Sequence, residues 1–226
     1  MSWFTNRLPA ARLRLLNILK PVTELIGNIH MPFSIKKITG EEALAAQAIM
    51  TPGMIFVVRT DGQLANIAIP GFWSHAATVS DSDHVVEATG IGVHDSNIFD
   101  FLLRRDYAVL LKPKFATPDQ MKVAAQYVVD QIGAKYDYDF LAVQDTEAEI
   151  AAGDAVSQRA FYCSKLPWAA YRKACGPNVP FTTRLTLGVQ TVVPADYILA
   201  VNKWEVVWAS KTAKPHLVST KKLSCP

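Results

Sequence analysis

The chain has 226 residues, of which 50% are hydrophobic and 19% charged, a composition that excludes intrinsic disorder and collagen-like repeats. Its net charge is +3, but residues 1–40 carry six Lys or Arg against one Glu and residues 211–226 carry four Lys and no acid, which leaves −6 for residues 41–210. An acidic central region argues against nucleic acid as a partner. The apolar stretches are shorter than the roughly 20 residues that a membrane-spanning helix needs.

Residues 1–30 predict a helix with one apolar face and basic side chains elsewhere. The apolar residues recur at spacings of three and four, and they are Leu8, Ala11, Leu15, Leu19, Val22 and Ile26. Pro21 must break or kink this helix. A basic amphipathic helix can lie on a membrane surface, dock on a partner or pack on its own domain, and the sequence leaves these alternatives open.

The following part of the chain predicts short strands separated by turns. The expected strands are residues 54–59, 64–69, 74–79, 84–88 and 107–111, with a last one at residues 206–208, because these runs are rich in β-branched and aromatic residues. Asp61-Gly62 is a hairpin signal between the first two runs. We therefore expect residues 54–59 and 64–69 to pair with each other.

Two helices are expected among these strands. Thr117 and Gln120 form a capping box around Pro118, which suits a first helical position. The expected core face of this helix is Met121, Ala124, Ala125, Val128 and Ile132, with Gly133 closing it. The second helix covers about residues 164–175, because Pro167 is tolerated only in a first turn and Gly176-Pro177 ends it. Clustered strands and helices without regular βαβ alternation predict an α+β fold.

A hairpin centred on residues 81–83 would bring a histidine and a carboxylate together. If these three residues form the loop, Ser80 pairs with His84 and His75 lies opposite Thr89. Glu87 then lies on the same sheet face as His75, within reach of its ring, whereas a shift of one residue would separate them. A carboxylate in that place orients an imidazole and favours its protonated form.

Cys163 is predicted at the N-terminus of the second helix. Free N–H groups and the positive end of the helix dipole lower the pKa of a thiol there and can hold an oxyanion. Cys175 lies at the opposite end of the helix and is expected to be structural, and Cys225 to be inert. An odd set of three cysteines without a C-x-x-C pair predicts neither a disulfide framework nor a zinc site.

Four segments resemble a known enzyme group: FWSHAATV, HVVEATGIGV, GAKYDYDF and FYCSKLPWAAY. Over residues 50–208 the chain is similar to the permuted NlpC/P60 papain-like enzymes of the YiiX/YaeF group, in which the histidine and carboxylate precede the cysteine. The resemblance implies a circularly permuted papain-like fold, with a small antiparallel sheet or barrel packed against helices. Together with the charge pattern of the two ends, this predicts three parts. They are a basic amphipathic helical extension at residues 1–45, a catalytic domain at residues 46–210 and a basic flexible tail at residues 211–226.

The resemblance implies a role for each matching residue. Cys163 would be the nucleophile, His75 the general base, and Glu87 the residue that orients His75. Tyr136 matches the tyrosine whose hydroxyl assists the oxyanion, and Tyr138 is the alternative. Two residues depart from the family pattern, since Lys165 replaces a usual acid and Pro167 a usual aliphatic residue.

The expected function is a cysteine amidase or peptidase that forms a thioester acyl-enzyme with a peptide- or lipid-like acyl substrate. A lipid-directed acyltransferase or hydrolase related to lecithin–retinol acyltransferase, and a non-catalytic envelope- or particle-associated binding protein, are the alternatives. No cofactor is expected. Residues 1–40 are the expected site of peripheral membrane or protein contact. The N-terminus shows no cleavable signal peptide, so we expect a cytoplasmic protein.

Two further sets of polar residues could form a metal site or an anion-binding site, and the sequence supports neither strongly. His84, His94 and Asp95 lie close in sequence but lack the spacing of metal ligands, so no metal site is expected. Arg104 and Arg105 are expected on a solvated face, with binding of an anionic substrate as the alternative.

Overall fold

A computed structural model describes residues 37–63, 66, 69–138, 155–177, 179, 184–186 and 189–217. The predicted amphipathic helix within residues 1–30 lies outside this part of the chain. Within it, no helix has both the length and the apolar character that crossing a membrane requires.

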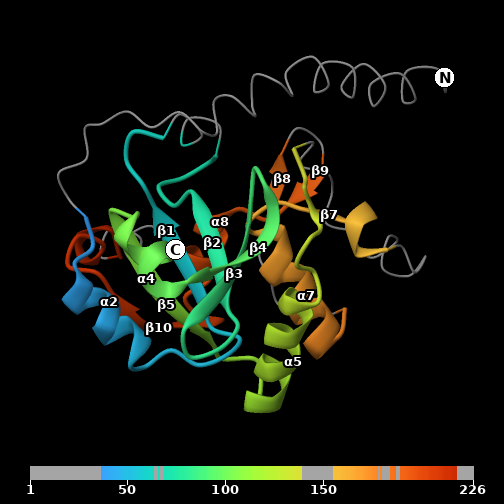
Figure 1. Cartoon of the computed structure of the whole chain (residues 1–226), viewed down its shortest axis with the longest axis horizontal. Coiled ribbons are helices and arrows are strands. Elements are labelled where there is room, and N and C mark those ends of the chain that lie inside the picture. Colours follow the sequence, from blue (N-terminus) through green and yellow to red (C-terminus); the bar gives the residue numbers. More distant parts are fainter. Residues whose placement is uncertain are drawn as a thin grey trace.

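An antiparallel six-stranded sheet forms the centre of the domain (Figure 1). Its strand order is β10-β5-β1-β2-β3-β4, and the bounds are β1 Ile55–Arg59, β2 His75–Val79, β3 His84–Thr89, β4 Gly92–Asn97, β5 Tyr107–Pro113 and β10 Trp204–Ala209. β10 and β4 are its two edges, so it is an open sheet and not a barrel. The predicted α+β class and small antiparallel sheet are confirmed.

The pairing of β1 differs from the predicted hairpin. β1 pairs with β2, with Val57 opposite Ala76, and with β5 on its other side. Of residues 64–69 the structure describes only Asn66 and Ile69, and neither lies in a strand. The physical reason is burial, because the backbone groups of a buried strand such as β1 need hydrogen-bond partners on both sides. The expected turn residue Asp61 is bound elsewhere, since its N–H donates to Asp106 Oδ2 at 2.7 Å.

Strand β4 was not predicted as a separate element. Residues 94–97 are His, Asp, Ser and Asn, which have little β propensity. They form a strand because they pair with β3 in an unbroken antiparallel register from His84 opposite Asn97 to Thr89 opposite Gly92. Pairing with an apolar neighbour thus overrides the local preference of these residues.

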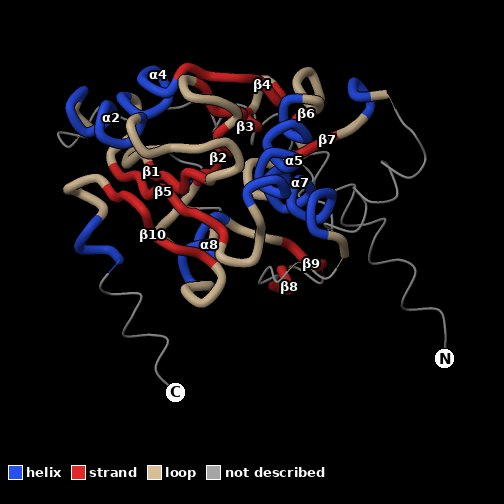
Figure 2. Tube along the Cα trace, turned by 90° about the horizontal axis from the view of Figure 1, so that it is seen from below, coloured by secondary structure: helices blue, strands red, loops and turns tan. Residues whose placement is uncertain are grey.

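The helices cover the sheet in two groups. Figures 1 and 2 show α5, Pro118–Val129, and α7, Lys165–Cys175, side by side, with α2, Gly40–Gln47, and α4, Ile98–Leu103, on the other side of the domain. Shorter elements are α8, Pro194–Leu199, the 3-10 helix η1, Val156–Gln158, a parallel pair β6, Lys135–Tyr136, and β7, Ala160–Phe161, and an antiparallel pair β8, Arg184–Thr186, and β9, Val189–Thr191.

Helix α5 begins as predicted and ends earlier. The capping box of Thr117 and Gln120 is present, and Met121, Ala124, Ala125 and Val128 are buried. The helix ends at Val129, so Ile132 lies in the following turn and is 40% exposed, while Tyr127 is buried in the helix instead. The prediction of Ile132 in the core is therefore wrong.

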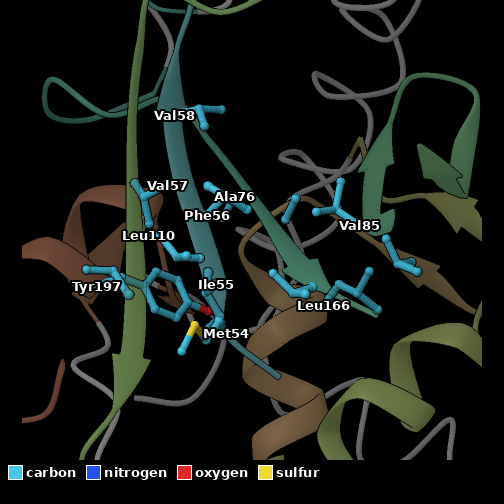
Figure 3. Close-up of a cluster of buried hydrophobic side chains, with 14 of the residues drawn as sticks. Met54, Ile55, Phe56, Val57, Val58, Ala76, Val85, Leu110, Leu166 and Tyr197 are labelled. Atoms are coloured by element: carbon cyan, nitrogen blue, oxygen red, sulfur yellow. The ribbon is translucent and has the colours of Figure 1, made fainter. Parts of the chain in front are cut away.

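Part of the core lies between the sheet and helices α7 and α8, and the same core also includes side chains of α2, α4 and α5. Figure 3 shows Leu166 of α7 and Tyr197 of α8 among the side chains of β1, with Ala76 and Val85 from the neighbouring strands. Leu166 is fully buried and follows Cys163 by three residues. The packing of this first helical turn therefore holds the cysteine segment against the sheet.

Residues 211–217 belong to the predicted flexible tail but contact the domain. Ala213 is fully buried, and the His216 ring stacks on Phe72 with centroids 3.9 Å apart. The N–H of Lys211 donates to Glu42 Oε1 at 2.7 Å. Residues 218–226 lie outside the described part.

Candidate active site

The β2–β3 hairpin places His75 beside Glu87. Its register, Ala77 opposite Glu87 and Val79 opposite Val85, is the one predicted from a three-residue loop. The two side chains therefore share a sheet face, and His75 Nε2 lies 2.6 Å from Glu87 Oε2. Since His75 is 14% exposed and Glu87 only 6%, little water screens this contact.

Helix α7 presents Cys163 at its N-terminus. Ser164 is the N-cap and Pro167 lies in the first turn, so the predicted start of the helix is confirmed. The Ser164 backbone is anchored from α8, because the Tyr197 hydroxyl donates to the Ser164 carbonyl at 2.7 Å. Ser164 Oγ in turn donates to the Val192 carbonyl at 2.8 Å. These bonds fix where the preceding residue, Cys163, meets the sheet.

The Cys163 sulfur contacts His75, and this contact changes the pKa of both groups. The thiol is hydrogen-bonded to the His75 ring and receives the backbone N–H of Ala76. Because Nε2 faces Glu87, Nδ1 is the ring nitrogen left for the sulfur. Burial alone would lower the pKa of His75, but the hydrogen bonds and negative charges of Cys163 and Glu87 raise it to about 9.

The partners of His75 shift in the complementary direction. Burial would raise the pKa of Cys163, but the His75 hydrogen bond and charge and the Ala76 N–H lower it below its usual value. Burial would likewise raise the pKa of Glu87, and its bond to His75 with the nearby Arg105 lowers it to about 2. These shifts all favour the charged forms, which are a thiolate, an imidazolium and a carboxylate in a row.

Glu87 is held by three further side chains that sequence reasoning did not assign to the site. Arg105 Nη2 lies 3.1 Å from Oε2, Ser96 Oγ donates to Oε1 at 2.8 Å, and His94 Nε2 lies 3.7 Å from Oε1. The prediction of a solvated Arg105 is wrong, since its side chain is only 13% exposed. The pairing of β4 with β3 puts His94 opposite Glu87. A prediction of this pairing would have revealed His94 and Ser96 as site residues.

The segment that follows Gly133 brings Tyr136 to the cysteine. Tyr136 pairs with Phe161, two residues before Cys163, in the parallel β6–β7 ladder. Burial, followed by the negative charge of Cys163, raises the pKa of the Tyr136 phenol well above its usual value, so it stays protonated. The Tyr138 hydroxyl instead donates to the Gly90 carbonyl at 2.9 Å, which favours Tyr136 of the two tyrosines.

A buried ion pair links the same two segments. Lys165 Nζ lies 3.0 Å from Asp137 Oδ2, and the side chains are 0% and 2% exposed. Lys165 follows Cys163 by two residues and Asp137 follows Tyr136 directly, so the pair joins the nucleophile segment to the tyrosine segment. The unusual lysine thus has a local counter-charge.

No three His, Cys, Asp or Glu side chains gather as a metal-binding set within the described residues. His84 contacts Asp81, with Nδ1 3.2 Å from Oδ1, and His94 contacts Glu87. His84 and His94, which were considered as metal ligands, therefore face different carboxylates.

Comparison with known proteins identifies one family. A model of the permuted papain-like amidase enzymes, the YaeF/YiiX, C92 family, matches residues 50–220. Neither the curated proteins nor the solved structures contain a match.

Proposed function

Because the chain belongs to the permuted papain-like amidase family YaeF/YiiX, C92, we propose that it is a cysteine-dependent amide hydrolase working through Cys163, His75 and Glu87. Membership of this family implies a hydrolase. The single observation that carries the assignment of residues is the His75 ring, which is hydrogen-bonded to the Cys163 thiol and to Glu87. A nucleophile, a base and an orienting group in that order are what acyl transfer requires.

In the first step the Cys163 thiolate attacks the carbonyl carbon of an amide, and the carbonyl electrons move to its oxygen. Two donors suit this oxyanion, the backbone N–H of Cys163 and the protonated hydroxyl of Tyr136. The amides of Lys165 and Leu166 are used elsewhere, because both donate to the Tyr162 carbonyl. The oxyanion site of this proposal is therefore built from the cysteine amide and the Tyr136 hydroxyl.

In the second step His75 gives its proton to the leaving amine, the C–N bond breaks and a thioester with Cys163 remains. Neutral His75 then takes a proton from water as the water attacks the thioester. The C–S bond breaks, the acid product leaves, and the thiolate–imidazolium pair forms again. Glu87 keeps the ring oriented and its charge balanced throughout.

The test is capture of the acyl-enzyme. The full-length protein is incubated with a panel of N-acyl p-nitroanilides and peptide amides, quenched in acid and measured by mass spectrometry. We expect an acyl adduct on Cys163 that hydroxylamine removes, and we expect it to be absent from Cys163→Ala with the fold unchanged. Cys175→Ala is the matched control and should keep the adduct, because burial at the C-terminal end of α7 raises the pKa of that thiol. Undiminished turnover by Cys163→Ala would refute the nucleophile.

A lipid-directed acyltransferase or hydrolase is the second candidate, favoured by the basic amphipathic pattern of residues 3–26. Such a segment would bring an enzyme to anionic lipid. Flotation of the full chain with phosphatidylserine vesicles tests it, with Arg7, Arg12 and Arg14 each changed to Glu as the comparison. Equal flotation of the two proteins would remove the support for this candidate.

A further inference from the structure

Arg105 is a largely buried cation beside the candidate active site, and the proposed chemistry does not use it. Its Nη2 and the Nε2 of His75 contact the same oxygen of Glu87, at 3.1 Å and 2.6 Å. The two positive groups therefore lie within about 6 Å of each other, a distance at which like charges shift each other's protonation. Arg105 thus acts on the imidazole through the carboxylate oxygen that both groups contact.

Packing alone does not explain why the Arg105 side chain is largely buried. Its guanidinium lies over the Phe101 ring of α4, 4.9 Å from the centroid, and its Nε has no hydrogen-bond partner within the described residues. Its backbone is engaged separately, because its N–H donates to the Leu102 carbonyl and its carbonyl accepts the Ile38 N–H. Burying a guanidinium with one carboxylate partner is a weak source of stability, so its charge calls for another role.

The side chains that contact Glu87 come from three parts of the chain. His75 faces it from β2, His94 and Ser96 from β4, and Arg105 from the turn between α4 and β5. On the other side of His75, the negative charge of a Cys163 thiolate contributes to raising the pKa of Tyr136, Tyr162 and Tyr197. The buried Lys165–Asp137 pair begins two residues after Cys163. Arg105 and a Cys163 thiolate attract each other.

We propose that Arg105 is a positioning residue that, through Glu87, sets the pH range over which the Cys163 thiolate and His75 imidazolium coexist. This inference rests on the proposed function. The four groups form a row of alternating charge, with Cys163 negative, His75 positive, Glu87 negative and Arg105 positive. The net charge of such a row is zero, and each ion lies next to an ion of opposite charge.

The direction of the effect follows from the signs. The positive charge of Arg105 stabilises the thiolate and disfavours the imidazolium, so removing it raises the pKa of both Cys163 and His75. The whole pH window of the ion pair then moves upward. A variant that merely displaced Glu87 would act differently, because loss of the carboxylate contact lowers the pKa of His75. The direction of the shift therefore separates a charge effect from structural damage.

The experiment measures alkylation of Cys163 by iodoacetamide from pH 4 to pH 11 in the full chain, read by mass spectrometry of the Cys163 peptide. The main variant is Arg105→Gln, which keeps a donor for Glu87 but has no charge, and Arg105→Met is the second. We expect both midpoints of the reactivity profile to move up by about one pH unit, so alkylation below the lower midpoint falls about tenfold. Arg105→Lys should restore the wild-type profile.

Arg104→Gln is the matched control. Arg104 is the neighbouring cation but is exposed, so water and salt screen it and its loss should leave both midpoints unchanged. Midpoints of Arg105→Gln that stay in place or move down would overturn the inference. So would failure of both uncharged variants to fold while Arg105→Lys folds, because the charge would then serve the structure.

The wild-type profile separates this inference from the proposed function. If wild-type Cys163 alkylates no faster than Cys175 near pH 6, there is no activated thiol and the proposed function fails. If wild-type Cys163 is activated and Arg105→Gln leaves its profile in place, the nucleophile stands and the role of Arg105 fails.

Discussion

Replacement of Glu87 by Gln tests the electrostatics of the site directly. Glutamine keeps the shape of the side chain and an acceptor for His75 Nε2, but it removes the negative charge that lies 2.6 Å from the ring. Because Arg105 stays beside the ring, its positive charge then acts on His75 without the carboxylate. Both changes disfavour the imidazolium, so we expect the pKa of His75 to fall.

The size of the fall follows from the Coulomb energy of a close ion pair. Two unit charges about 4 Å apart interact with about 4 kcal/mol at an effective dielectric constant of about 20, and one pKa unit corresponds to about 1.36 kcal/mol. At that separation of the charge centres, the charge of Glu87 accounts for about 3 units. Since Cys163 shares in raising the pKa of His75 to about 9, we expect a fall of about 1–3 units.

The assay is a pH titration of ¹⁵N-imidazole resonances in the full-length protein. The chain has five histidines, and the His75 signals are identified by their loss in His75→Asn. Ser96→Ala is the control, because it removes a 2.8 Å hydrogen bond from the other oxygen of Glu87 while the charge remains, and it should move the midpoint by much less. A His75 midpoint that stays near 9 in folded Glu87→Gln would refute the reasoning.

Three further predictions concern positioning and stability. Tyr136→Phe removes one oxyanion donor and should lower kcat/KM by about 10²–10³-fold, whereas Tyr138→Phe should not; equal losses in a steady-state assay would reject the choice between them. Lys165→Met leaves the carboxylate of Asp137 buried without its cation and should lower the free energy of unfolding by about 3–5 kcal/mol, and an unchanged urea midpoint would contradict this. Thr117→Ala removes the N-cap of α5 and should lower the free energy of unfolding by about 1 kcal/mol without changing kcat/KM. A lower kcat/KM with an unchanged free energy of unfolding would contradict this prediction.

The local features of the site were predictable because each depends on residues close in sequence. A three-residue loop determines the register of the β2–β3 hairpin, and with it the shared face of His75 and Glu87. Pro167 determines where α7 begins, and with it the place of Cys163. The local sequence is enough for these inferences, because a turn or a helix start determines the positions of residues only a few places away.

The residues that tune the site were not predictable in the same way. Arg105 looks like half of an exposed basic pair with Arg104, and only the turn after α4 buries it against Glu87. Lys165 looks like a departure from the family pattern, and only the approach of the β6 segment supplies Asp137. No spacing rule links residues 87 and 105, or 137 and 165, because the chain between them leaves the site and returns.

The amino-acid sequence by itself determined the α+β class, the strand register that joins His75 to Glu87, and the helix start that presents Cys163, since periodicity, turn residues and proline act over a few positions. Tertiary structure alone decided that the thiol meets the ring, that the Tyr138 hydroxyl donates to the Gly90 carbonyl, and that Arg105 and Lys165 have counter-charges. The physical reason is range: burial and ion pairing depend on which distant segments pack together, and that choice is made by the whole core.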